Sequence, residues 1–102
     1  MKKLLFVVVA LLITLSFVFA NERTERIIDN FWNKGQVVKW IDDDNTINYG
    51  SKSIIKYIAI GKEDNGDEGI GIEFLDSRMN VYYEKEWNIS SDSSGNIVLK
   101  RK

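Results

Sequence analysis

The chain of 102 residues contains no cysteine, no histidine and no proline. Without cysteine it cannot form a disulfide, which small domains often use to compensate for a limited core. Its stability must therefore come from packing or from association with a second chain. We find no internal repeat, and no proline-containing linker or change of composition marks a second domain.

The absence of histidine and cysteine also closes several catalytic routes. A Ser–His or Cys–His nucleophile pair, a histidine general base and a His/Cys zinc site all need these residues. A glycine-rich phosphate loop is also missing. We predict that the protein is not an enzyme and uses no cofactor. A small hydrolase that depends on carboxylates alone is the catalytic alternative.

The first 20 residues have the features of a signal peptide. Lys2 and Lys3 precede an apolar run of 16 residues from Leu4 to Phe19, and Val18-Phe19-Ala20 fits a signal peptidase site. This run is shorter than the roughly 20 residues that usually span a bilayer. We predict cleavage after Ala20, export to the periplasm or the exterior, and membrane contact during export only.

Residues 21–102 are predicted to form one small domain. Once Lys2 and Lys3 are removed, these 82 residues carry 12 Lys plus Arg against 15 Asp plus Glu, a net charge of −3. Nucleic-acid binding would call for a basic excess on one face, so we expect no nucleic-acid partner. Nine aromatic residues supply a core, since each can bury on the order of 150 to 250 Å². They are Phe31, Trp32, Trp40, Tyr49, Tyr57, Phe74, Tyr82, Tyr83 and Trp87.

The clearest strand signal is a hairpin whose strands, 70–75 and 81–90, are joined by the polar turn 76–80. Apolar residues alternate along both strands, as they do when one face of a sheet is buried. The face of the second strand that we expect to be buried consists of Val81, Tyr83, Trp87 and Ile89, with Lys85 as the one exception.

A helix is predicted from about Glu25 to Lys34. Thr24 is the expected N-cap, with Asn21 as an earlier alternative, and Gly35 stands where a left-handed C-terminal residue belongs. A helix of about ten residues is marginal alone, so its apolar stripe should lie on the sheet. The stripe consists of Ile27, Ile28, Phe31 and Trp32.

Further strands are predicted at 36–41, 46–49, 53–60 and 97–100. Turns rich in Asp, Asn, Ser and Gly separate them, and Asn65-Gly66 is a strong turn dipeptide. Strand 53–60 is apolar on both faces, which indicates a curled sheet, a small barrel or a dimer interface.

Together these elements predict an α+β fold, in which the N-terminal helix packs on a curled antiparallel sheet of five or six strands in meander order. The element order resembles the broad shape of a cystatin-like domain, a resemblance of shape alone. The alternative is a small β-barrel capped by the helix.

The acidic turns are candidate calcium sites, because calcium prefers hard oxygen ligands. The residues concerned are Asp42, Asp44, Asp64 and Asp67. Counting from Asp64, however, the twelfth position is Leu75 and not the Glu of an EF-hand loop. Polar hairpin turns have the same composition, so we favour turns without a metal.

Four residues are candidates for ligand contact. Glu84 and Glu86 share a face of the predicted strand, where two carboxylates can divide acid and base roles if one is desolvated. Trp40 and Tyr82 can line a groove for a peptide, a sugar or an apolar ligand, whereas Trp87 and Tyr83 are assigned to the core.

The function predicted from the sequence is that of an exported, non-catalytic binding domain of the cell envelope or exterior. An inhibitor and a ligand-binding module are two forms of it. The partner would be a protein or a small ligand, and a homodimer is a further alternative.

Overall fold

The computed structural model describes residues 22–102; the predicted signal peptide, residues 1–20, and the alternative helix start at Asn21 lie outside them. A helix covers residues 22–34. It is followed by β1 (Val37–Ile41), β2 (Ile47–Ser51), the 3-10 helix η1 (Lys52–Ile54), β3 (Ile55–Lys62), β4 (Glu68–Phe74), β5 (Asn80–Tyr83), β6 (Trp87–Ser91) and β7 (Ile97–Arg101). In this part of the chain no helix is both long and apolar enough to cross a membrane. The predicted α+β class is confirmed.

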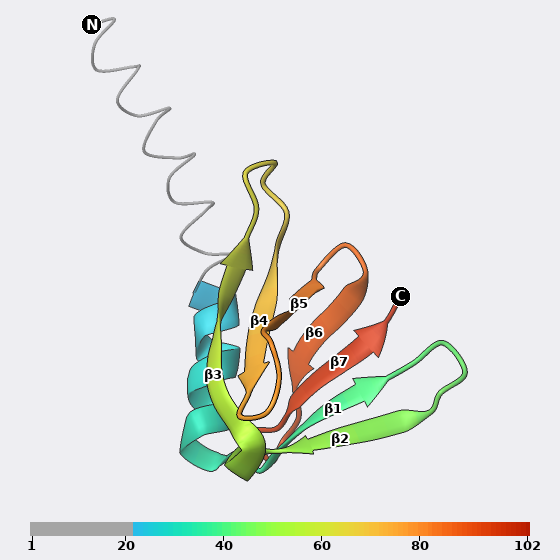
Figure 1. The fold of residues 1–102 in the computed structure, drawn as a ribbon. Helices are drawn as coiled ribbons and strands as arrows, with labels where there is room; N and C mark the ends of the chain where they lie inside the picture. The colour runs from blue at the N-terminus through green and yellow to red at the C-terminus, as the bar shows by residue number, and fades with distance from the viewer. Residues whose placement is uncertain (1–21) are drawn as a thin grey trace, which may run out of the picture.

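The seven strands of the described residues form two open sheets (Figure 1). One sheet has the order β2-β1-β7-β6 and the other the order β3-β4-β5. All neighbouring pairs among them are antiparallel except β1 and β7, which run parallel. A single sheet in meander order was thus the wrong expectation, because β7 returns to pair with the first strand. The alternative of a closed barrel is also wrong.

The apolar stripe of the helix packs on strands, as predicted, but it does so against the inner faces of two sheets (Figure 1). Ile27, Ile28 and Phe31 belong to a single buried core that takes alternate residues from the strands, because successive strand residues point to opposite faces. Trp32 lies at the rim of the stripe with 37% of its surface exposed and meets the ring of Phe31 edge-on. The strand residues of the core are Val38, Ile55, Ile58, Ile70, Ile72, Trp87, Ile89, Ile97 and Leu99.

The predicted strand 81–90 is in fact two strands. β5 ends at Tyr83 and β6 begins at Trp87, and residues 84–86 form a turn between them. This turn changes the phase of the alternation, so that Tyr82 packs on the core from β5 whereas Trp87 and Ile89 enter it from β6. The prediction of which side chains are buried is therefore correct for β6. In β5 the opposite set of side chains faces the core.

Two consequences follow for side chains on the inverted segment. Val81, expected to be buried, is 38% exposed on the outer face of β5. Lys85 is no longer an exception on an apolar face, because it lies in the turn and pairs with Asp67 at 2.7 Å from Nζ to Oδ2. Its ammonium group also lies 5.4 Å from the centre of the Tyr83 ring.

The helix ends differ from the expectation. Thr24 lies inside the helix and is buried, so it is not the N-cap. Gly35 follows the helix but does not adopt a left-handed φ. A Cβ at Gly35 would stand 2.4 Å from the backbone oxygen of Gly95. Glycine is therefore required at this position because the two backbone segments approach closely, and not because of a left-handed backbone conformation.

A β-bulge in β3 explains why that strand reads as apolar on both faces. The register with β4 shifts between Ile55 and Tyr57, so Ile55 and Ile58 both enter the core although they are three residues apart. Ile54, expected on the same face as Ile58, belongs to η1 and is 45% exposed.

Trp87→Ala should lower the free energy of unfolding by about 3–5 kcal/mol, because the ring is buried and its contacts would be replaced by a cavity. Trp87 is 8% exposed, meets Tyr82 edge-on at 5.5 Å and carries the Arg101 guanidinium 5.0 Å above its ring. The matched control Trp32→Ala should cost about 1 kcal/mol. Urea unfolding measures both, and equal losses would contradict this placement of the two rings.

Candidate binding surface

The structure brings together Trp40 and Tyr82, two of the predicted ligand-contact residues. Their ring centroids lie 6.1 Å apart. Phe74 approaches Trp40 at 5.8 Å, and Trp87 meets Tyr82 at 5.5 Å. This aromatic row, Phe74–Trp40–Tyr82–Trp87, joins the inner faces of the two sheets and packs with the core.

The indole N–H of Trp40 is buried without a well-formed hydrogen bond. The hydroxyl of Tyr82 is nearby: burial raises the pKa of Tyr82, and the Trp40 N–H partly opposes that rise. On the other side, a Cβ at Gly50 would stand 2.5 Å from the Trp40 ring. Because the donor atom is closed off from solvent, the row contributes packing between the sheets and presents no accessible donor.

Glu84 and Glu86 do not share a strand face, because both lie in the turn between β5 and β6. The backbone N–H of Glu84 donates to the carbonyl of Glu68 at 2.8 Å, and that of Glu86 to the carbonyl of Tyr83 at 3.0 Å. Glu86 is exposed and Glu84 is half-buried. The strand placement on which paired acid–base chemistry depended is therefore wrong.

The acidic residues predicted as calcium ligands belong to two hairpins that point apart (Figure 1). Asp42 and Asp44 lie between β1 and β2, and Asp64 and Asp67 between β3 and β4. Hydrogen bonding to the Thr46 side chain is the main reason that the pKa of Asp44 is lowered. Among residues 22–102 no three carboxylates gather in a way that could hold a metal ion.

An exposed apolar surface lies on the outer face of β3, β4 and β5, and the sequence analysis missed it. We call this surface, made of Tyr57, Ala59, Gly61, Gly69, Gly71, Met79 and Val81, the outer platform; Gly69 and Gly71 are buried beneath its side chains. Strand pairing sets Ala59, Gly71 and Val81 side by side across the sheet. Val81 and Met79 lie over the glycines: a Cβ at Gly61 would stand 3.0 Å from Val81 Cγ1, and one at Gly71 2.9 Å from Met79 Sδ.

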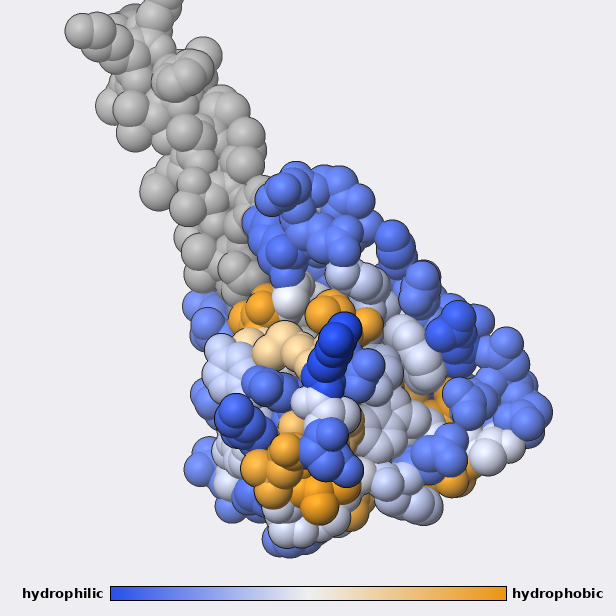
Figure 2. Space-filling model, in the orientation of Figure 1, coloured by the Kyte–Doolittle hydropathy of each residue, from blue (hydrophilic) through white to orange (hydrophobic). Residues whose placement is uncertain are grey.

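The outer platform remains open to solvent in spite of this cover. Tyr57 is 50%, Met79 42% and Val81 38% exposed. At the adjoining end of the sheet Leu75 and Ile54 are also exposed, and the N–H of Leu75 donates to the carbonyl of Ile54 at 3.0 Å. Figure 2 shows apolar surface on this side of the molecule, interrupted by charged side chains. The solvent face of an antiparallel sheet is usually polar.

The signal for this surface is present in the sequence but is hidden by the phase change in the predicted strand 81–90. Read as one strand, that segment turns Val81 inward. When β5 is treated as a separate strand whose Tyr82 faces the core, Val81 faces outward and lies beside Gly61 and Gly71.

A groove of about 400 Å³ lies between the helix and β6 and is lined by Arg23, Arg26, Ile27, Asn30, Ser90 and Ser91. Arg23 donates from Nη2 to the carbonyl of Ile89 at 3.0 Å. Asn30 donates from Nδ2 to Ser91 Oγ at 2.8 Å. Helix side chains thus cover the outer edge of β6.

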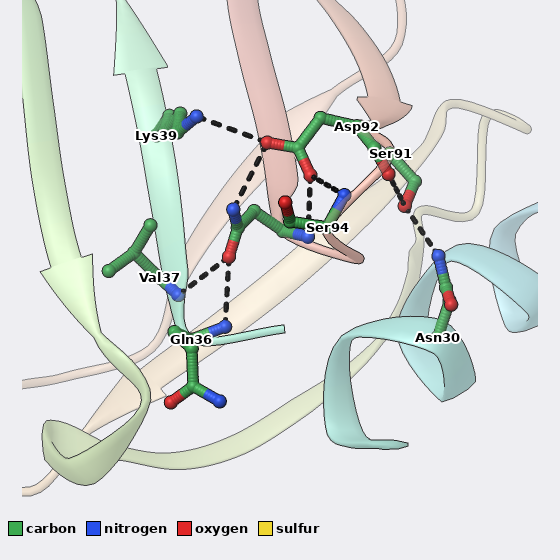
Figure 3. A network of polar contacts seen from close by, with 8 residues as sticks. Asn30, Gln36, Val37, Lys39, Ser91, Asp92 and Ser94 are labelled. Atoms are coloured by element: carbon green, nitrogen blue, oxygen red, sulfur yellow. Dashed lines mark hydrogen bonds and ion pairs between the residues drawn. The ribbon is translucent and has the colours of Figure 1, made fainter. Parts of the chain in front are cut away.

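A polar network ties the β6–β7 loop to the start of β1 (Figure 3). Asp92 Oδ2 accepts hydrogen bonds from Lys39 Nζ and Asn96 Nδ2, both at 3.0 Å. Asn96 Oδ1 accepts from the backbone N–H groups of Gln36 at 2.8 Å and Val37 at 3.1 Å. Because Asn96 is buried, this network holds β1, and with it the β1–β2 hairpin, in place.

The network also sets the charge state of Asp92. Partial burial alone would raise the pKa of Asp92, but hydrogen bonds from Asn96, Lys39 and the backbone N–H of Ser94 outweigh it and lower the pKa to about 2. Asp92 therefore stays ionised in the folded protein under mildly acidic conditions.

No protein-family model, no curated protein and no solved structure matches this chain. Its function is therefore inferred from its own surfaces, among them the outer platform.

Asp92→Asn should lower the free energy of unfolding by about 1–2 kcal/mol at neutral pH, because the ion pair with Lys39 is lost while the shape is kept. A depressed folded-state pKa stabilises the fold above the ordinary value of 3.8 and ceases to do so as the pH falls through about 2. Unfolding measured across that range should show the wild type and the variant converging at the acid end. A constant difference would contradict this role of Asp92.

Proposed function

We propose that the protein is an exported, non-catalytic interaction domain that binds a protein of the cell envelope or exterior through the outer platform. The observation that carries this proposal is the exposed apolar outer face of β3, β4 and β5. Apolar surface of this kind on a soluble domain commonly marks an interaction site.

The shape of the platform favours a protein over a small ligand. Its centre is formed by glycines, and Val81 and Met79 lie across them. Small ligands are usually bound in concave clefts with convergent polar groups. Aromatic side chains and methionine are instead enriched where two proteins meet, and Tyr57 and Met79 supply both types here.

Export is part of the proposal and depends on the predicted signal peptide. A basic start, an apolar run too short to span a bilayer with ease and a small residue at Ala20 support it. The periplasm or the exterior is then where the partner would be met. The carboxylate-dependent hydrolase gains no support from Glu84 and Glu86, which lie in a turn.

Val81→Glu should reduce capture of the partner by about tenfold or more, since it places a charge at the centre of an apolar interface. The matched control is Asn88→Glu, an exposed position on β6 in the other sheet. The tagged protein, secreted by the producing cells, is used to capture partners from their envelope and medium fractions, and bound protein is quantified by mass spectrometry.

Equal capture by the two variants would overturn the assignment of the outer platform. An unchanged melting temperature for Val81→Glu, expected because Val81 is already partly exposed, would show that reduced capture is not a result of unfolding.

A further inference from the structure

Two open sheets leave four strand edges in the described part of the chain, at β2, β6, β3 and β5. An edge presents unpaired backbone N–H and C=O groups that can pair with another chain, and proteins usually cover, charge or shorten such edges. Three of the four edges carry such protection, and the fourth, β2, is engaged only at its end.

The three protected edges use different devices. On β6, Arg23 bonds the free carbonyl of Ile89. β5 is only four residues long, and the carbonyl of Tyr83 at its end already accepts a hydrogen bond from the Glu86 N–H. β3 carries a β-bulge and the charge of Lys56.

β2 is longer than β5 and has neither a bulge nor a charged residue; only at its end is a carbonyl engaged, because Ser51 is the N-cap of η1 and its carbonyl accepts the first hydrogen bond of that 3-10 helix. At one end Lys52 N–H bonds the carbonyl of Gln36 at 2.8 Å, and at the other Asp42 N–H bonds that of Thr46 at 3.1 Å. The even-numbered residues of β2 are therefore the ones that bond to β1, and the odd-numbered residues direct their backbone groups away from it. The odd-numbered residues are Ile47, Tyr49 and Ser51.

The side chains along this edge are uncharged, and two of them are large and exposed. Ile47 is 48% and Tyr49 62% exposed. β2 is the outermost strand of a hairpin that extends away from the body of the molecule (Figure 1). A second chain can therefore approach the edge without displacing another element.

We propose that two copies of this chain pair antiparallel through the free edges of β2, about a two-fold axis at Tyr49. In this register Tyr49 faces Tyr49 of the second copy and Ile47 faces Ser51, which forms about four backbone hydrogen bonds, because the Ser51 carbonyl is engaged in η1. The four-stranded sheets of the two copies then become one sheet of eight strands. Such an interface is self-complementary, as two-fold symmetry requires.

Charge supports a second copy as the occupant. Antiparallel pairing brings the acidic turn Asp42–Asp44 of one copy to the end of β2 where the other copy has Lys52. The Lys52 ammonium group donates to the carbonyl of Trp32 at 2.6 Å, so it places a positive charge near that end of the paired strands without leaving its own helix contact. No charged residue lies within β2, so no like charges face each other across the axis.

The dimer goes beyond the proposed function and uses a different surface. Pairing through β2 leaves Tyr57, Met79 and Val81 of both copies free, because they belong to the other sheet. Loss of partner capture and loss of dimerisation are therefore separate results.

The first test compares Tyr49→Lys with the matched control Tyr57→Lys, which makes the same change at an exposed tyrosine of β3, 50% exposed. The protein is secreted by an exporting host, so that its own N-terminal processing is retained. Light scattering after size exclusion should give twice the chain mass for the wild type and for Tyr57→Lys. Tyr49→Lys should give the chain mass, because two lysines would meet at the axis.

A wild type of single chain mass would overturn the proposal. So would dissociation by Tyr57→Lys with Tyr49→Lys still dimeric, which would place the second copy on the outer platform. Circular dichroism of both variants checks that each remains folded, as their exposure leads us to expect.

The second test uses the absence of cysteine from the chain. Directly facing residues of a hydrogen-bonded antiparallel pair have Cα atoms about 5.5 Å apart, within the range that a disulfide spans. Mild oxidation should therefore crosslink Tyr49→Cys into a covalent dimer and leave Tyr57→Cys uncrosslinked. Equal crosslinking of the two variants, or none in Tyr49→Cys, would contradict the register.

Discussion

The burial of the helix stripe between the two sheets is the contact on which the rest of the structure depends. Each sheet has an apolar inner face, and the chain has no disulfide to hold the sheets together. Phe31 is fully buried between them, with Ile27 and Ile28 beside it. Without these side chains both inner faces would be exposed to water, since neither sheet can bury its own apolar face.

That arrangement also decides which surfaces remain free. The helix occupies the inner faces and, through Arg23 and Asn30, the edge of β6. What it leaves open is the outer face of β3-β4-β5 and the edge of β2, and most of the large exposed apolar side chains lie there. The two surfaces proposed for binding therefore lie where the helix does not reach the sheets.

Polar contacts take over part of the role that disulfides play in other small domains. Asn96 bonds two backbone N–H groups at the start of β1, and Asp92 holds Asn96 and Lys39. This links the β6–β7 loop to a strand about sixty residues away in the chain. The β1–β2 hairpin is thus held at its base, so the free edge of β2 is presented on an ordered strand.

Features that depend on neighbouring residues were predictable from the sequence. The helix stripe at Ile27, Ile28 and Phe31 and the alternation at Ile70 and Ile72 were readable from period alone, and the Asn65-Gly66 turn from residue type. The parallel pairing of β1 with β7 and the turn at residues 84–86 became visible only in the folded chain. Glu84 and Glu86 fit the polar face of a strand as well as they fit a turn. Strand pairing across the chain is selected by packing, which local pattern does not contain.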